Sequence, residues 1–231
     1  GHWKFDETTG TTASDSSGNN NTGTLTNGPV WQSTGGKLGG ALSFDGVDDY
    51  INVPHNNALN IGTGSYTVSA WVKTSSIGYQ VIAMKNFTGN VGGDNGWVFY
   101  QLDTGKLQAR IRDGVAPSHN GTISTRTIND NTWHHVVMLV DRTANVVDAY
   151  IDNVRENKNS SIAGEGSVSN GSSLKLGGSG GIWPFNGLID DVRVYNRALT
   201  ATEVQTLATP DTTPPVRSTG SPTGTLYSGN T

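Results

Sequence analysis

The sequence predicts an all-β fold in which two antiparallel sheets pack face to face as a β-sandwich or jelly roll. Nearly every apolar segment is short, alternates with polar residues and is bounded by Gly, Asn, Ser or Asp, which is typical of strands with one buried face. Only the segment "TATEVQTLA" after Leu199 has a helical pattern. Many strands without alternating helices favour antiparallel sheets over a parallel one.

The composition restricts both core and partners. The chain has 231 residues with 31 Gly and no Cys, and its six Trp and seven Tyr supply bulk for a core although only 33% of residues are hydrophobic. A net charge of -4 provides no basic field for nucleic acid or an anionic membrane. Without cysteine there are no disulfides and no thiolate metal sites. No apolar run approaches the roughly 18 residues that span a bilayer.

About ten strands are expected along the chain. In the segment 65–73, Tyr66, Val68, Ala70 and Val72 fall on one face and the residues between them on the other. The same reasoning predicts a hairpin over 41–53 and further strands over 79–85, 96–102, 106–112, 133–141, 146–153, 172–178 and 187–195.

The C-terminal part contains a short helix and then a linker. Thr200 is a suitable helix N-cap with Glu203 three residues on, a capping-box arrangement. From residue 209 the chain is rich in Pro, Thr, Ser and Gly, which indicates a linker toward a further domain. We therefore expect one domain over 1–208 and a linker over 209–231.

Five segments in the correct order resemble the bacterial laminin-G-like, concanavalin A-like jelly-roll domains: "HWKFDETTGTTASDSSGNNNTGTL", "LSFDGVDDYINV", "YTVSAWVK", "TWHHVVMLVD" and "FNGLIDDVRVYNRALTATEV". The resemblance covers roughly residues 2 to 208. It implies two curved sheets with adjacent first and last strands, and often one Ca²⁺. Many such domains are carbohydrate-binding modules of secreted or cell-surface proteins, so the resemblance implies a polysaccharide partner, an extracellular bacterial location, covalently linked neighbouring domains and a monomer.

Catalysis is disfavoured. A retaining glycosidase on this fold needs two carboxylates about 5 Å apart, and the E-x-D-x-E pattern of jelly-roll glucanases is missing. Asp152 and Glu156 have the nearest spacing, but they lie in a turn-like stretch. His134 and His135 are adjacent on a strand and point to opposite faces, so they do not suit one zinc ion. No G-x-S-x-G nucleophile elbow is present.

The loop "DSSGNNN" is the candidate calcium site. Ca²⁺ takes six to eight oxygens from carboxylates, amides and backbone carbonyls. Asp15 offers a carboxylate, while Gly18 and the asparagines, Asn21 among them, allow the chain to curl so that several oxygens converge. The alternative is that Asp15 only begins an Asx-type turn.

Asp190 is the expected second carboxylate of this site. Strict alternation puts it on one face with Leu188, Val192 and Val194, and a carboxylate on an apolar face must be paired, protonated or bound to a metal. If first and last strands are neighbours, Asp190 lies near the Asp15 loop. The alternative is that it only accepts backbone hydrogen bonds. Asp45, Asp48 and Asp49 are explained by a hairpin turn and are left out of the predicted site.

Glycan binding requires aromatic rings beside planar polar groups. Trp183 lies in the glycine-rich "GGSGGIWPFNG" and is the first candidate; its alternative role is a lid on the core. Arg110 and Arg112 share the face of 106–112 opposite Leu107, Ala109 and Ile111, and two arginines there suit an acidic polysaccharide, although a solvated face explains them equally. The further candidates are Tyr79, Lys85 and Tyr100. The remaining tryptophans are expected in the core: Trp3, Trp31, Trp71, Trp97 and Trp133.

These observations together predict a non-catalytic, calcium-stabilised carbohydrate-binding module of a larger secreted protein. The alternative is a structural or adhesion spacer, or a protein-binding module, without a sugar site. A lyase or hydrolase is the third and least supported class.

Overall fold

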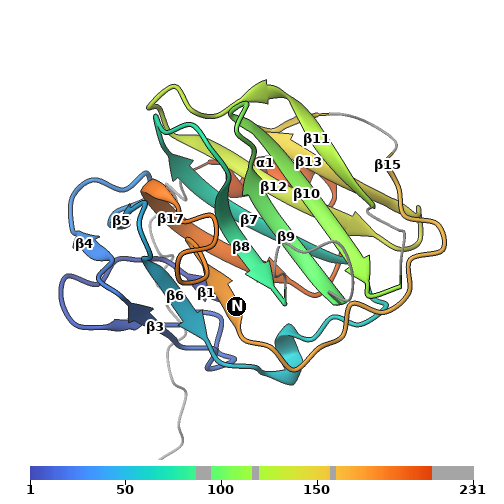
Figure 1. Ribbon diagram of the computed structural model, residues 1–231, viewed down its shortest axis with the longest axis horizontal. Helices are drawn as coiled ribbons and strands as arrows, with labels where there is room; N and C mark the ends of the chain where they lie inside the picture. Colours follow the sequence, from blue (N-terminus) through green and yellow to red (C-terminus); the bar gives the residue numbers. More distant parts are fainter. Residues whose placement is uncertain (87–94, 116–119, 157–159, 210–231) are drawn as a thin grey trace, which may run out of the picture.

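The computed structural model describes residues 1–86, 95–115, 120–156 and 160–209 (Figure 1). It confirms the predicted fold: two antiparallel sheets stack on each other, with β8 to β11 in the front layer of Figure 1 and β7, β12, β13 and β17 behind. The predicted linker, residues 209–231, lies outside the described residues apart from Thr209.

The first sheet has nine strands, and its central strand β7 pairs with both β12 and β17. Along the sheet the order is β14 (Val154–Arg155), β13 (Val146–Ile151), β12 (His134–Asp141), β7 (Tyr66–Lys73), β17 (Asn186–Tyr195), β5 (Ala41–Asp45) and β4 (Val30–Gln32), with β1 (His2–Trp3) beside β17 and β15 (Ser160–Ser161) beside β13.

The second sheet has eight strands and forms the other layer. Its order is β11 (Asn120–Thr127), β10 (Lys106–Asp113), β9 (Asn95–Gln101), β8 (Gln80–Lys85), β16 (Leu174–Leu176), β6 (Tyr50–Val53), β3 (Gly23–Thr26) and β2 (Thr12–Ala13). A single 3-10 turn, η1 (Asn57–Leu59), follows β6.

The core lies between the two sheets and follows the predicted alternation. Tyr66, Val68, Ala70 and Val72 of β7 are fully buried in it, and they belong to the same cluster as Leu107, Ala109 and Ile111 of β10 in the other sheet. The outer face of β10 is therefore left to Gln108 and Arg110. The prediction that Trp3 and Trp97 belong to the core is confirmed.

Three other tryptophans differ from that expectation. Trp31 packs at the edge of the core and is only partly buried. Trp71 is buried on the outer face of the nine-stranded sheet, where its ring centroid lies 5.3 Å from that of His135. Trp133 precedes β12 and is partly exposed. Alternation assigns a side chain to a face, but it does not tell whether a loop or a long side chain covers that face.

The first and last strands are neighbours, as the resemblance implies. His2 pairs with Arg193 and Trp3 with Val192. The final helix α1 (Ala201–Leu207) has the predicted capping box: the Glu203 amide donates to Thr200 Oγ1 at 3.3 Å, and the Thr200 amide donates to Glu203 at 2.9 Å. Val204 of this helix packs with Val137, Leu139 and Tyr150 on the outer face of the nine-stranded sheet.

The structure contains seven strands that periodicity did not predict. Six have two to four residues, too short to show alternation. The seventh is β11, whose sequence "NGTISTRT" is polar and begins with a turn-like Asn-Gly. It forms a strand because it pairs with β10 along its length. No helix in the described part of the chain is long and apolar enough to cross a membrane.

Candidate functional site

Three aromatic rings gather on the outer face of the eight-stranded sheet. The Trp183 ring lies 5.1 Å from Tyr79 and 5.0 Å from Tyr100 between centroids, and the two tyrosine rings lie 6.3 Å apart. The three planes are within 30° of one another. We call Tyr79, Tyr100 and Trp183 the aromatic cluster. The structure thus brings together three of the six predicted sugar-binding residues.

The cluster has a buried floor and an exposed rim. Tyr100 is only 1% exposed and packs with Val81, Met84 and Val98, outside the main core. Tyr79 is 42% exposed, and Trp183 is partly exposed between them. An aromatic surface fixed from below and open above is suited to stacking against the apolar face of a sugar ring.

The loop 177–185 holds Trp183 in place. It is closed at its base by the Phe185 amide, which donates to the Gly177 carbonyl at 2.9 Å, and it is tied to β8 by the Val81 amide, which donates to the Trp183 carbonyl at 2.8 Å. Trp183 itself has a left-handed backbone with φ 49°. A bulky residue in this region is strained and is kept there by its surroundings, a feature that clusters at binding sites.

Polar groups border the aromatic cluster along β10. Tyr100 donates its hydroxyl hydrogen to Gln108 Oε1, and Arg110 Nη1 donates to the Tyr100 oxygen at 3.5 Å. Burial raises the pKa of Tyr100, while Arg110 opposes the shift, so the phenol stays a neutral hydrogen-bonding group at physiological pH. Gln108 and Arg110 therefore offer an amide and a guanidinium beside the rings.

Arg112 and Lys85 are placed differently from each other and from this rim. Arg112 is on the same strand face as Arg110 but is 2% exposed. Lys85 lies on the inner side at the end of β8, opposite Trp97 and Leu174. Its ammonium donates to Ser172 O and, at 3.2 Å, to both oxygens of Asn170, and burial lowers its pKa to about 8. Lys85 thus fastens a loop to the sheet and is separated from the aromatic cluster.

The predicted calcium loop is organised around Asp15. Its carboxylate accepts hydrogen bonds from the His2 amide at 2.8 Å, the Ser17 amide at 2.9 Å, and the Asn21 amide and side chain at 2.8 and 2.9 Å. Burial favours the protonated form, but these donors outweigh it and hold the pKa of Asp15 well below its usual range. Gly18 lies at the exposed tip with φ 81°. Asp15, Gly18 and Asn21 thus share one loop.

Asp190 is bound to a different loop. Its Oδ2 accepts from the Lys37 and Leu38 amides, both at 2.8 Å, and burial raises its pKa to about 6. The predicted face of Asp190 was wrong, because a β-bulge between Asp190 and Arg193 shifts the register. Asp190 lies opposite Trp71 on the outer face, while Ile189 and Val192 point into the core.

The residues considered for catalysis are engaged in structural contacts. Glu156 accepts from the backbone amide and hydroxyl of Thr125 and from Arg126 Nε at 2.7 Å. Asp152 Oδ2 lies 2.8 Å from His134 Nδ1. His135 is buried against Trp71 and has a separate environment.

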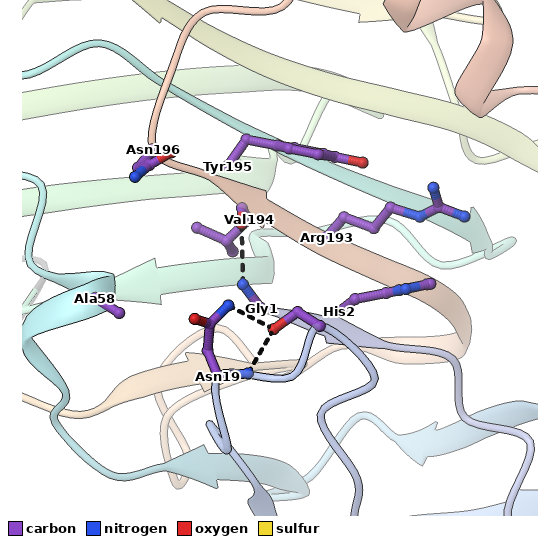
Figure 2. A pocket seen from close by; sticks show the side chains of 9 residues that line it. Gly1, His2, Asn19, Ala58, Arg193, Val194, Tyr195 and Asn196 are labelled. Atoms are coloured by element: carbon purple, nitrogen blue, oxygen red, sulfur yellow. Dashed lines mark hydrogen bonds between the residues drawn. The ribbon is translucent and has the colours of Figure 1, made fainter. Parts of the chain in front are cut away.

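A pocket of about 340 Å³ lies where the first residues meet the end of β17 (Figure 2). Two of its lining side chains contact the Asp191 carboxylate, which His2 Nε2 approaches to 2.6 Å and Arg193 Nη2 to 2.9 Å. This pocket is separate from the aromatic cluster, since none of the three rings lines it.

One group of carboxylates lies outside the calcium site that the sequence predicts. In the part of the chain that the structure describes, Asp45, Asp48 and Asp49 form the one group of three or more His, Asp or Glu side chains whose ligand atoms lie within 4.8 Å of one another. Three carboxylates in the five residues "DGVDD" were the available signal, which the hairpin interpretation set aside.

Comparison with known proteins agrees with this architecture. A laminin-G family model described as the concanavalin A-like lectin/glucanases superfamily matches residues 45–205. No curated protein sequence matches the chain. Among solved structures, domain 4 of AbnA, an extracellular GH43 arabinanase from Geobacillus stearothermophilus solved in complex with arabinotriose, is 25% identical with a TM-score of 0.66, over 90% of this chain and 97% of that domain.

Two further structures share the fold at lower identity. The binding domain of Paraclostridial Mosquitocidal Protein 1 is 22% identical with a TM-score of 0.68, over 85% of this chain and 49% of the other, so the chain spans about half of that structure. The Trypanosoma rangeli sialidase is 16% identical with a TM-score of 0.63, over 90% of this chain and 32% of the enzyme. The family match over most of the described strands, together with the two-sheet architecture, shows that this chain belongs to the concanavalin A-like lectin/glucanases superfamily.

Proposed function

We propose that this domain is a non-catalytic carbohydrate-binding module that recognises a polysaccharide through the aromatic cluster. The observation that carries the proposal is the cluster itself: three near-parallel rings, one buried and one 42% exposed, beside Gln108 and Arg110. Rings beneath a sugar and planar polar groups beside its hydroxyls are the two elements of a glycan site.

The comparison with the arabinanase domain supports the same class of ligand. That domain is described in complex with an arabinose oligosaccharide and matches this chain over nearly its whole length. An extracellular location and attachment to a larger bacterial carbohydrate-active or surface protein are part of the proposal, since that relative belongs to an extracellular enzyme. Arg110 adds affinity for an acidic polysaccharide, because guanidinium groups pair well with carboxylates.

The contacts of the acidic residues support a non-catalytic role. Glu156 and Asp152, the pair nearest to glycosidase spacing, are held by Thr125, Arg126 and His134. The general acid of a glycosidase has a raised pKa. Burial favours the protonated form of Glu156, but the hydrogen bonds from Thr125 and Arg126 outweigh it and lower the pKa of this carboxyl. Catalysis in the full protein is accordingly proposed for another domain.

Affinity gel electrophoresis on neutral and acidic polysaccharides tests the proposal. We expect retardation of the wild type on at least one glycan and its loss in Trp183→Ala and Tyr79→Ala, because each removes a stacking surface worth about 1 kcal/mol or more. Val154→Ala, an exposed apolar side chain of the other sheet, should bind as the wild type does.

Two results would contradict this assignment. No retardation on any glycan would favour the spacer or protein-binding alternative, in which the cluster only covers the sheet. Release of reducing ends or unsaturated products by this domain alone would instead revive the hydrolase or lyase class. A structural calcium ion is also part of the proposal.

A further inference from the structure

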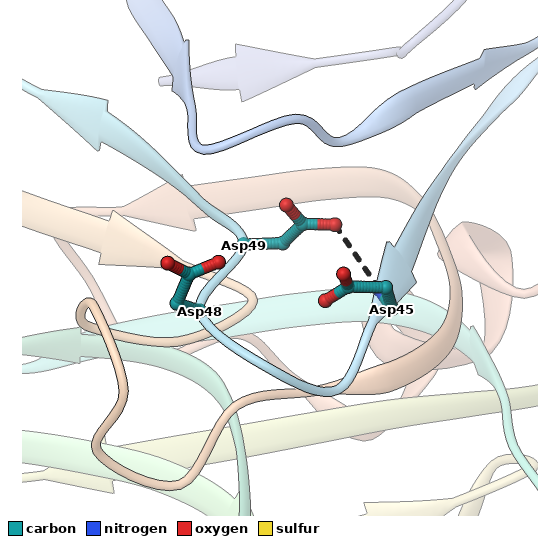
Figure 3. A group of neighbouring side chains, drawn as sticks. All are labelled: Asp45, Asp48 and Asp49. Atoms are coloured by element: carbon teal, nitrogen blue, oxygen red, sulfur yellow. Dashed lines mark hydrogen bonds between the residues drawn. The ribbon is translucent and has the colours of Figure 1, made fainter.

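The three carboxylates of Asp45, Asp48 and Asp49 occupy the loop that passes from one sheet to the other. β5 ends at Asp45 in the nine-stranded sheet, and β6 begins at Tyr50 in the eight-stranded sheet. Figure 3 shows the three side chains gathered on this short loop, with Asp49 between the other two. We call them the rim carboxylates.

The spacing of the rim carboxylates fits one cation. One oxygen from each residue lies within 4.8 Å of the others. Calcium binds oxygens at 2.3–2.6 Å, so two ligands of one ion are at most about 5 Å apart. All three oxygens can therefore belong to one coordination sphere.

A second observation concerns the partners of Asp49. This side chain is 3% exposed, and its Oδ1 is buried without a hydrogen-bond partner among the residues that the structure describes. Its Oδ2 accepts only from the Asp45 amide at 3.1 Å, within the same loop. A buried carboxylate oxygen without a donor costs free energy unless a cation or a proton compensates it.

No basic side chain supplies that compensation. Among the residues that the structure describes, the rim carboxylates form no ion pair, whereas Asp148, Asp152, Glu156, Asp191 and Glu203 each have an arginine or histidine partner. Three like charges of the same loop are thus brought together without a counter-charge. This distinguishes the rim carboxylates from the Asp15 loop, where four donors already satisfy the carboxylate.

The site is also open enough to be filled. Asp45 is exposed, Asp48 is half-buried and Asp49 is buried, so the group runs from solvent to the interior. Neighbouring segments fix the loop: Asn27 Nδ2 donates to the Asp48 carbonyl at 3.0 Å, and a Cβ added to Gly178 would come within 2.8 Å of the Asp49 carbonyl oxygen. Water and backbone carbonyls can complete the six to eight ligands of calcium.

We infer that Asp45, Asp48 and Asp49 form a Ca²⁺ site that joins the two sheets at the β5–β6 loop. The ion offsets two of the three negative charges of the rim carboxylates and braces the base of the loop 177–185, since Gly178 packs directly on this segment. The inference concerns metal binding alone, so it holds whether or not the aromatic cluster binds a glycan.

Isothermal titration calorimetry with CaCl₂, together with thermal unfolding in Ca²⁺ and in EDTA, tests this site. The whole chain, freed of metal, should bind one Ca²⁺ per molecule, and Ca²⁺ should raise its Tm because a ligand of the native state stabilises it. Asp48→Asn, a nearly isosteric change at a half-buried position, should bind at least tenfold more weakly. Asp45→Asn, at the exposed end, is the second variant should Asp48→Asn be unstable.

Asp15→Asn is the matched control, because it alters the loop that the sequence suggested. It should keep the affinity and the Tm shift of the wild type. Loss of binding in Asp15→Asn with full binding in Asp48→Asn would overturn the location. Absence of both binding heat and Tm shift in the wild type at millimolar Ca²⁺ would overturn the site.

Discussion

At the residue scale, a buried histidine on the outer face of the nine-stranded sheet makes the stability of the fold depend on pH. His135 is 2% exposed and packs against Trp71 with the two ring planes tilted by 48°, and burial lowers its pKa to about 4. The carboxylates of Asp191 and Asp152 oppose this shift but do not cancel it. His135 is therefore neutral in the folded protein throughout the physiological range.

Replacing His135 should reduce the acid sensitivity of the fold. In the unfolded chain His135 takes up a proton below about pH 6.5, while in the folded chain it does so only near pH 4. The free energy of unfolding therefore falls as the pH is lowered from 6.5 toward 4, by about 3 kcal/mol for this one group. His135→Phe keeps an aromatic ring against Trp71 and should lose less stability between pH 7.5 and 4.5, as measured by urea unfolding. An equal loss in both proteins would contradict this role.

The surroundings of Asp190 are the main feature at this scale that the sequence did not predict. Asp190 was expected beside the Asp15 loop, but its Oδ2 accepts from the Lys37 and Leu38 amides. The amide donors of Asp15 lie instead at the start of the chain and within its own loop. The bulge at Asp191, with φ 49°, shifts the alternation by one residue. A bulge depends on the partner strands, so periodicity along one strand does not reveal it.

At the element scale, the loop 177–185 is built on a glycine that no other residue can replace. Gly177 has φ 78°, and a Cβ there would lie 2.2 Å from the Phe44 ring. Phe44 in turn packs edge-on against Phe185 at 6.2 Å between ring centroids. The position of Trp183 thus depends on close packing at the base of its loop.

Gly177→Ala should therefore be much more harmful than a matched change at Gly181. Both glycines have positive φ, but nothing lies within 4 Å of a Cβ at Gly181. Gly181→Ala carries only the conformational cost of about 1 kcal/mol, whereas Gly177→Ala adds an overlap with Phe44 that costs about 1–3 kcal/mol more. Urea unfolding of the two variants checks the difference, and equal losses would show that the packing of Phe44 yields easily.

At the scale of the whole molecule, the sandwich is closed by residues from opposite ends of the domain. Trp3 of β1 is fully buried, pairs with Val192 of β17 and donates from Nε1 to the Asn21 carbonyl at 2.8 Å. The Asp15 loop is attached to the same strand through the His2 amide. The N-terminal segment is thus an integral part of the core.

Trp3→Ala should destabilise the entire domain. Removal of a fully buried tryptophan costs about 3–5 kcal/mol because it leaves a cavity between the sheets. Trp31→Ala is the control: Trp31 is only partly buried, and its loss should cost clearly less. Calorimetric unfolding measures both, and a single transition is expected to shift in each variant. A Trp3→Ala protein as stable as Trp31→Ala would show that β1 is dispensable.

The sequence by itself determined the fold class, the long strands apart from β11, the capped helix and the family, because alternation, turn residues and caps are local properties of the chain. It also marked Trp183, Tyr79 and Tyr100 as aromatic candidates. Only the tertiary structure decided that these rings meet, that Lys85 is turned inward, that Asp190 binds another loop, and that Asp45, Asp48 and Asp49 converge. The loop "DSSGNNN" is held by amide donors to Asp15, whereas Asp49 in the β5–β6 loop keeps one buried carboxylate oxygen without a donor among the described residues. Such juxtapositions depend on sheet pairing and register between segments far apart in the chain, which local patterns do not encode.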